Sequence, residues 1–307
     1  MRPNRIAVAV AAGARALSGA RALAPTQLSS NNCFGGQWRR FQFESATLKT
    51  PTTFSVFTPP QPEGAPCLFY LSGLTCTDEN YVQKAGAARA AAAHGVALVA
   101  PDTSPRLPDG AKLPGEDDAY DFGSGAGFYV DATEAPWSEH YQMLSFITEE
   151  LPEAVAAAAP SLDVSTRSIT GHSMGGHGAL TIALRDPKTW RSVSAFSPIS
   201  NPTQVPWGKK AFEGYLGSVE AGKAHDATEL VRSSQFPDTI LISQGADDNF
   251  LVGDVDQLQP EAFRSACDAV GQPLDLRYEA GYDHSYFFIS TFIDEHVAFH
   301  AERLLKK

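Results

Sequence analysis

One short motif in the middle of the chain could activate a serine for nucleophilic attack. The letters GHSMG at 171–175 follow a short apolar run and precede a stretch that can continue as a helix. A Gly-x-Ser-x-Gly pattern is typical of a serine on a tight strand-to-helix turn, where only glycine leaves room beside it. Ser173 is therefore the candidate nucleophile. The backbone N–H of Met174, at the start of the expected helix, is placed to stabilise the oxyanion that forms during attack on a carbonyl group.

The motif alone does not establish catalysis, because short patterns of small residues also occur in ordinary turns. A serine needs a histidine base, and that histidine needs a carboxylate to fix its tautomer. In α/β-hydrolases the acid and then the histidine follow the serine along the chain, each after a strand of the sheet. The segments QGADDNFL at 244–251 and GYDHS at 281–285 supply both in that order. His284 is the predicted base, whereas Asp247 and Asp248 both remain candidates for the acid, since adjacent loop carboxylates point in different directions.

The other histidines near these motifs are weaker candidates for the base. His172 alternates away from Ser173 on the turn, and His177 comes one helical turn later. His296 and His300 are four residues apart, a spacing that could mimic a pair of metal ligands, but no third ligand stands in matching register. We expect these two side chains to be solvated or at the edge of the core. The sequence implies neither a metal nor an organic cofactor.

Strands and helices alternate along the chain in the way needed to bring these groups together. The pattern predicts an α/β fold with a mostly parallel sheet and helices on both faces. The expected strands are 53–58, 67–71, 96–100, 168–172, 192–196, 239–243 and 274–279, and the expected helices are 78–94, 139–158, 174–184, 260–269 and 286–305. The segment 102–137 is rich in Gly, Pro and Asp and too long for an ordinary connection, so we predict a lid or a wall of the active site.

Composition limits the classes of partner. A chain of 307 residues with 43% hydrophobic residues can bury the core of one large α/β domain. The formal net charge of −11 argues against nucleic acid or an anionic membrane as partner. No run approaches the ~18–20 apolar residues of a transmembrane helix. The four cysteines, at 33, 67, 76 and 267, form no Cys-x-x-Cys pair, which favours free thiols in a reducing compartment.

The first residues differ in composition from the rest of the chain. Residues 1–28 are rich in Ala, carry four Arg, and precede the first acidic residue, Glu44. This bias resembles an organellar transit peptide, whereas Arg15 interrupts any secretory signal. The remaining interpretation is a disordered extension or a misassigned start. We therefore divide the chain into an N-terminal extension, 1–28, and a catalytic domain, 29–307. We expect a cytoplasmic protein, or a mitochondrial or plastid one if the extension is a transit peptide.

Seven segments together resemble one known family. They are GLTCT at 73–77, APDTSPR at 100–106, DFG at 121–123, GFYVDAT at 127–133, GHSMGGHG at 171–178, PWGKKAF at 206–212 and YDHSY at 282–286. In this order, and over roughly residue 29 to the C-terminus, they are similar to S-formylglutathione hydrolase, also called esterase D. The resemblance implies an α/β-hydrolase fold with Ser173 as nucleophile, Asp248 as acid and His284 as base. It also implies that Leu74 and Met174 supply the N–H groups of the oxyanion hole.

The resemblance further implies a reaction and a pocket. The reaction is hydrolysis of S-formylglutathione to glutathione and formate, in formaldehyde detoxification, through an acyl-enzyme on Ser173 and without a cofactor. A broad-specificity carboxylesterase is the alternative, because a Ser-His-Asp site does not choose between oxygen and sulfur leaving groups. A catalytically inactive binding module is a third hypothesis, which the complete set of three residues disfavours. The resemblance also implies a homodimer.

Three further residues are predicted to line the substrate pocket. In the family a cysteine at the position of Cys76 makes the esterase sensitive to thiol reagents, although a small buried side chain without a role is the alternative. Trp207 and Lys209, with the adjacent Lys210, are expected to shape the pocket or attract the carboxylates of glutathione. Lysine pairs on loops are more often simply solvated.

Overall fold

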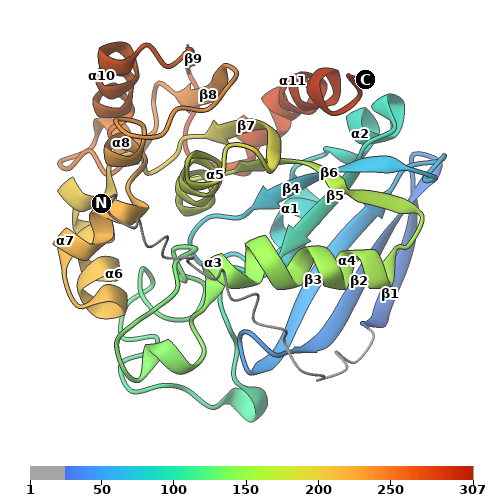
Figure 1. Ribbon diagram of the computed structural model, residues 1–307, viewed down its shortest axis with the longest axis horizontal. Coiled ribbons are helices and arrows are strands. Elements are labelled where there is room, and N and C mark those ends of the chain that lie inside the picture. The colour runs from blue at the N-terminus through green and yellow to red at the C-terminus, as the bar shows by residue number, and fades with distance from the viewer. Residues whose placement is uncertain (1–24, 307) are drawn as a thin grey trace, which may run out of the picture.

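A nine-stranded sheet forms the centre of the computed structural model, which describes residues 25–306 (Figure 1). The strand order is β1-β2-β3-β5-β4-β6-β7-β8-β9, and every neighbouring pair from β5 to β9 in this order is parallel. The predicted mostly parallel sheet is confirmed. The strands are β1 (Thr26–Cys33), β2 (Gly36–Ser45), β3 (Thr50–Thr58), β4 (Ala65–Leu71), β5 (Ala97–Pro101), β6 (Leu162–Gly171), β7 (Trp190–Phe196), β8 (Ile240–Gly245) and β9 (Leu274–Glu279).

Helices cover both faces of this sheet, as predicted (Figure 1). On one face α1 (Asp78–Lys84), α2 (Ala88–His94) and α11 (Tyr286–Leu304) contribute to one apolar layer. On the other, α4 (Leu151–Ala158), α5 (Met174–Arg185) and α10 (Pro260–Val270) contribute to a second layer. The remaining helices are α3 (Met143–Ser145), a π-helical turn (Phe146–Glu150), α6 (Pro206–Leu216), α7 (Val219–Gly222), α8 (Ala227–Leu230), α9 (Asn249–Val252) and 3-10 turns at Pro108–Gly110, Trp137–Glu139, Pro202–Gln204 and Lys223–His225.

Two of the expected helices differ from the structure. The helix predicted over 78–94 divides into α1 and α2, because Gly86 adopts a left-handed conformation with φ of 73°. The helix predicted over 139–158 begins at Met143 and contains the π-helical turn before α4. Apolar periodicity does not register such interruptions, since the residues on both sides of them still face the core.

The hairpin of β1 and β2 was missed by the sequence analysis. Strand β1 is exposed along nearly its whole length, so it has no alternation of buried and exposed residues to reveal it. It begins at Thr26, so its first residues fall within the extension predicted for 1–28. Residues 1–24 of that extension lie outside the described part of the chain, and the predicted targeting role with them.

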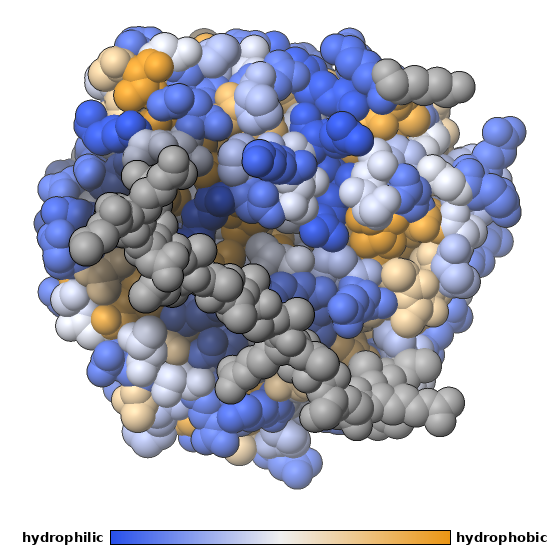
Figure 2. Space-filling view, viewed as in Figure 1, coloured by the Kyte–Doolittle hydropathy of each residue, from blue (hydrophilic) through white to orange (hydrophobic). Residues whose placement is uncertain are grey.

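The face of the molecule drawn in Figure 2 is mostly polar. Hydrophilic residues dominate the face in Figure 2, with apolar residues in small separate groups.

Over residues 25–306, no helix combines the length and apolar character needed to cross a membrane. All four cysteines are free thiols, of which Cys67 and Cys267 are buried.

His296 and His300 are fully buried between α11 and the sheet, so the expectation of solvated or core-edge side chains was wrong. His300 contacts the hydroxyls of Ser192 and Ser194 at 2.7 and 2.8 Å through its two ring nitrogens. His296 in turn contacts Ser194 and Ser243 at 2.9 and 3.1 Å. Serines two apart on a strand face the same side, so Ser192 and Ser194 of β7, together with Ser243 of β8, can satisfy both imidazoles without water. The four-residue spacing of His296 and His300 on α11 therefore places both rings in one structural hydrogen-bond network.

This network makes the fold sensitive to acid. Burial lowers the pKa of His300 to about 3 and that of His296 well below its ordinary value. An unfolded histidine gains its proton near pH 6.5, whereas the folded one stays neutral. Each such histidine therefore lowers the free energy of unfolding by about 1.4 kcal/mol per pH unit as the pH falls from about 6.5 towards its folded pKa.

We predict that His300→Gln makes this acid dependence shallower by about that slope, because one titrating group is removed. The measurement is urea denaturation at several pH values between about 7 and 4.5. This range includes the unfolded pKa of about 6.5 and stays above the folded pKa. His94→Gln, which removes an exposed histidine at the end of α2, is the matched control, and its slope is the reference for His300→Gln. An unchanged slope in His300→Gln would mean that His300 binds its proton equally well in the folded and the unfolded protein, which would contradict this interpretation.

Candidate active site

Ser173 lies at the sharp turn between β6 and α5, as the motif predicts. Its backbone adopts φ of 57° and ψ of −119°, a strained conformation for a residue other than glycine. The turn has no room for side chains on either side. A Cβ atom at Gly175 would lie 1.9 Å from the Leu71 carbonyl oxygen, and one at Gly171 would lie 2.2 Å from the Gly175 carbonyl oxygen. The two glycines of the motif therefore allow α5 to start directly against the end of β4.

Two backbone N–H groups lie beside this serine. Met174 is the first residue of α5, and Leu74 belongs to the loop that follows β4. The same loop approaches the nucleophile closely, since a Cβ atom at Gly73 would lie 3.1 Å from the Ser173 Cβ atom. Within residues 25–306, the N–H groups of Leu74 and Met174 donate to no backbone carbonyl. They are thus available to a developing oxyanion.

The loop over residues 73–76, here called the oxyanion loop, is held in place by a partly buried ion pair. The Cys76 carbonyl accepts hydrogen bonds from Thr103 Oγ1 at 2.5 Å and from Arg106 Nη2 at 3.3 Å. Arg106 is itself fixed by two hydrogen bonds to the Asp102 carboxylate, at 2.8 and 3.0 Å. The sequence analysis included these residues in a family motif but gave them no role.

The predicted wall, 102–137, also contacts this loop. Thr75 adopts a left-handed conformation with φ of 66°, and its N–H donates to the Gly125 carbonyl at 2.9 Å. The Gly125 N–H donates in turn to the Ser104 hydroxyl at 2.8 Å. The GSG letters at 123–125 therefore support the oxyanion loop.

Asp248 and His284 form the acid-histidine pair. Asp248 Oδ2 lies 2.5 Å from His284 Nδ1, and the carboxylate is fully buried. Its Oδ1 accepts from the Phe250 N–H at 2.9 Å, which orients the carboxylate. The side chain of Asp247 is exposed instead. Sequence reasoning from the residues left both aspartates open, and the backbone direction after β8 places Asp248 against the histidine.

His284 stands next to the nucleophile's own segment. Its ring packs against that of His172, the residue before Ser173, with centroids 4.4 Å apart. Among the described residues the Ser173 hydroxyl makes no hydrogen bond to His284; this contact commonly tightens only when substrate binds. Because the Nδ1 atom of His284 is hydrogen-bonded to Asp248, its Nε2 atom is left for proton transfer.

The two histidines that flank Ser173 are buried and neutral. Burial, and then the neighbouring His284, lowers the pKa of His172 well below its ordinary value. Burial lowers the pKa of His177 to about 3, and its Nε2 lies 3.0 Å from the Phe128 carbonyl oxygen. His172 therefore packs behind the predicted base, and His177 anchors α5 to the wall.

Aromatic side chains extend from His284 to form one side of the site. The ring centroid of Phe250 is 4.8 Å from that of His284, and Trp207 follows 4.7 Å from Phe250. Trp207 is buried, and its Nε1 donates to the Tyr120 hydroxyl at 3.1 Å. Trp207, which was predicted to line the pocket, thus belongs to a row of packed aromatic rings that begins at His284. Phe250 and Tyr120 were not predicted, because nothing in their local sequence marks them.

The other predicted pocket residues differ in their surroundings. Lys209 is exposed on α6, whereas Lys210 forms an ion pair with Asp121 at 2.7 Å. Cys76 is half-buried, and burial raises the pKa of its thiol. A thiol with a raised pKa is a poor nucleophile at neutral pH, which leaves Ser173 as the reactive group. Over residues 25–306, no three His, Cys, Asp or Glu side chains are grouped to hold a metal ion.

Comparisons with known proteins agree with this geometry. The Esterase family model matches residues 45–299. An S-formylglutathione hydrolase of Rattus norvegicus is 52% identical over 282 residues, covering 91% of this chain and 98% of the relative. One of Paracoccus denitrificans is 50% identical over 285 residues, covering 92% and 99%. The solved structure of an S-formylglutathione hydrolase from Agrobacterium tumefaciens has a TM-score of 0.86 at 46% identity and covers 91% of this chain and 99% of that one.

A parallel sheet with a serine on a strand-to-helix turn and an acid-histidine pair after later strands defines a serine hydrolase of the α/β-hydrolase fold. Within this class, the chain belongs to the Esterase family and, there, to the S-formylglutathione hydrolases.

We predict that Arg106→Gln lowers kcat about tenfold to a hundredfold with little change in KM, because a displaced Leu74 N–H affects mainly the transition state. Steady-state kinetics with an aryl acetate measures both constants. Arg89→Gln, which removes an exposed ion pair to Asp294, is the control and should retain full activity. A raised KM with unchanged kcat in Arg106→Gln would contradict the role given to Arg106.

Proposed function

We propose that the chain hydrolyses S-formylglutathione to glutathione and formate through a formyl-enzyme on Ser173. The observation that supports this mechanism most directly is the Asp248-His284 pair next to a serine held at a positive φ on a sharp turn. The substrate is inferred from relatives that are S-formylglutathione hydrolases. These relatives align with this chain over nearly their whole length. No cofactor takes part in the proposed reaction.

In the first step, Ser173 Oγ attacks the thioester carbonyl carbon while His284 Nε2 takes the hydroxyl proton. Asp248 holds Nδ1–H of the same ring and stabilises the imidazolium that forms. The negative charge moves to the carbonyl oxygen, where the N–H groups of Leu74 and Met174 are preorganised to receive it. The tetrahedral intermediate then collapses by breaking the C–S bond.

In the second step, the glutathione sulfur leaves and takes the proton from His284. Water then enters, and His284 removes its proton as the oxygen attacks the formyl-ester carbon. Collapse of this second intermediate breaks the bond to Ser173 Oγ, which regains its proton, and formate is released. Since a thiolate leaves readily, stabilisation of the oxyanion is the main task of the site.

We predict that Ser173→Ala abolishes turnover of both S-formylglutathione and an aryl acetate. Asp248→Asn should lower kcat by on the order of 10³–10⁴, because the amide favours the wrong histidine tautomer. The matched change Asp247→Asn, at the exposed neighbouring carboxylate, should leave kcat within about twofold, as expected for a surface position. Equal losses in the two aspartate variants would refute the assignment of Asp248 as the acid.

The choice of leaving group separates the proposed reaction from that of a broad carboxylesterase. We expect kcat/KM for S-formylglutathione to exceed that for an aryl acetate by about 10² or more, since binding energy from the peptide portion can lower the transition state. Both substrates are compared with the same preparation. A ratio near or below one would make the chain a general carboxylesterase while leaving the Ser173 mechanism intact.

The partner in this proposal is the small-molecule substrate. Nucleic acid and membrane surfaces are excluded from it on the grounds of the acidic net charge. Homodimerisation and a cytoplasmic location, or an organellar one directed by the N-terminal extension, are also proposals.

A further inference from the structure

His172, the residue before the nucleophile, is a buried polar side chain without hydrogen bonds. The residue is only 6% exposed. Both ring nitrogens are buried, and neither forms a hydrogen bond of normal geometry within the described part of the chain. An unsatisfied buried donor or acceptor lowers the free energy of unfolding, whereas an apolar side chain of similar size would not. Hydrogen bonding therefore gives this imidazole no role in the stability of the free protein.

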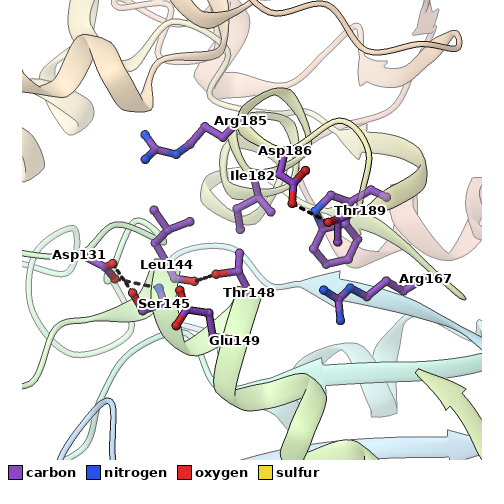
Figure 3. A pocket seen from close by; sticks show the side chains of 11 residues that line it. Asp131, Leu144, Ser145, Thr148, Glu149, Arg167, Ile182, Arg185, Asp186 and Thr189 are labelled. Carbon is purple, nitrogen blue, oxygen red and sulfur yellow. Dashed lines mark hydrogen bonds between the residues drawn. The ribbon is translucent and has the colours of Figure 1, made fainter. Parts of the chain in front are cut away.

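The surroundings of His172 differ from those of another unsatisfied nitrogen, the Nε atom of Arg167. The Arg167 side chain borders a cavity of about 440 Å³, drawn in Figure 3. A polar cavity of this size can admit water, which would satisfy the nitrogen. Acidic and basic side chains line this cavity together, so its charge selects no class of ligand. The imidazole of His172 lies instead against groups of the active site.

His172 contacts both parts of the catalytic machinery. The centroid of its ring lies 4.4 Å from that of His284 and 6.1 Å from that of Tyr286. A Cβ atom at Gly73 would lie 3.2 Å from His172 Nδ1, so the oxyanion loop also approaches the ring closely. The imidazole is therefore placed between the base and the loop that receives the oxyanion.

The imidazole of His172 also interacts with the backbone of His284. This interaction favours the protonated form of His172, although burial outweighs it and lowers the pKa of that residue. The backbone group that favours a protonated imidazole is a carbonyl oxygen, because it accepts a hydrogen bond from a ring N–H. The His284 carbonyl thus lies near a ring nitrogen of His172, outside the geometry of a normal hydrogen bond.

A second contact of the base is open in the same way. Among the described residues, the Ser173 hydroxyl forms no hydrogen bond to His284. Both open contacts join the same two segments, the turn at 172–173 and the loop that carries His284. A small approach of these segments would close both contacts together. Catalytic hydrogen bonds commonly tighten in this way when the substrate or the transition state is bound.

We propose that His172 is a positioning residue for the reaction. Its ring N–H donates to the His284 carbonyl as Ser173 transfers its proton, and this hydrogen bond holds the base against the nucleophile. The inference rests on the acyl-enzyme mechanism proposed above, and it applies to thioester and ester substrates alike. Because the hydrogen bond forms fully only in the transition state, it raises kcat without stabilising the free protein.

Two substitutions test the donor. His172→Gln keeps an N–H donor in a side chain of similar size, whereas His172→Leu has none. With an aryl acetate, we expect His172→Leu to lower kcat about tenfold with KM within about twofold, the effect of one lost hydrogen bond in the transition state. His172→Gln should keep about a third of kcat or more, since its amide can donate instead. Equal losses in the two variants, or full activity in His172→Leu, would overturn the proposal.

Phenylboronic acid supplies a readout that does not depend on turnover. Its boron accepts the Ser173 oxygen, the proton passes to His284, and the tetrahedral adduct resembles the transition state. Its inhibition constant should therefore rise about tenfold in His172→Leu and stay within about threefold in His172→Gln. An unchanged inhibition constant in His172→Leu would contradict the role given to His172.

Urea denaturation at about pH 8, where histidines are neutral in the folded and the unfolded chain, separates positioning from a structural role. His172→Leu should leave the midpoint unchanged or raise it, because no hydrogen bond of the free protein is lost. His300→Leu is the matched control and should lower the midpoint, since Ser192 and Ser194 lose a hydrogen-bonding partner. An equal fall in His172→Leu would refute the positioning role. Retained turnover in Ser173→Ala would refute the mechanism itself.

Discussion

The close approach of α5 to the end of β4 is the constraint on which the site depends. At Gly175 a single Cβ atom would lie 1.9 Å from the Leu71 carbonyl oxygen, so helix and strand can meet only across a glycine. This contact goes with the strained, positive-φ conformation of Ser173 and puts the Met174 N–H beside it. It also brings the oxyanion loop within reach of the nucleophile. Backbone packing therefore creates the oxyanion site before any side chain takes part.

The parallel sheet brings the remaining groups to the same edge. Leu74, Ser173, Asp248 and His284 follow β4, β6, β8 and β9, whose carboxyl ends lie on one side of the molecule. Helix α11 begins two residues after His284, and its own His296 and His300 attach it to hydroxyls of β7 and β8. A buried polar network that takes no part in catalysis thus helps to fix the loop carrying the base.

Support for the oxyanion loop comes from an element that is irregular in sequence. The ion pair of Asp102 and Arg106 holds the Cys76 carbonyl, and Gly125 holds Thr75 from the other side. From its length and its many turn residues, the segment 102–137 was predicted to be a lid or a wall, but no contact of a particular side chain could be predicted. Which of its side chains touch the loop depends on hydrogen bonds between residues some 30 to 50 positions apart, a distance over which local patterns carry no information.

The sequence by itself determined the fold class, the nucleophile turn and the order of acid and base, because short-range sterics and strand periodicity are local properties. It could not choose between Asp247 and Asp248 from the residues, and it misjudged His296 and His300. Only tertiary structure decided these points, since burial of a side chain depends on what the sheet and α11 place opposite it.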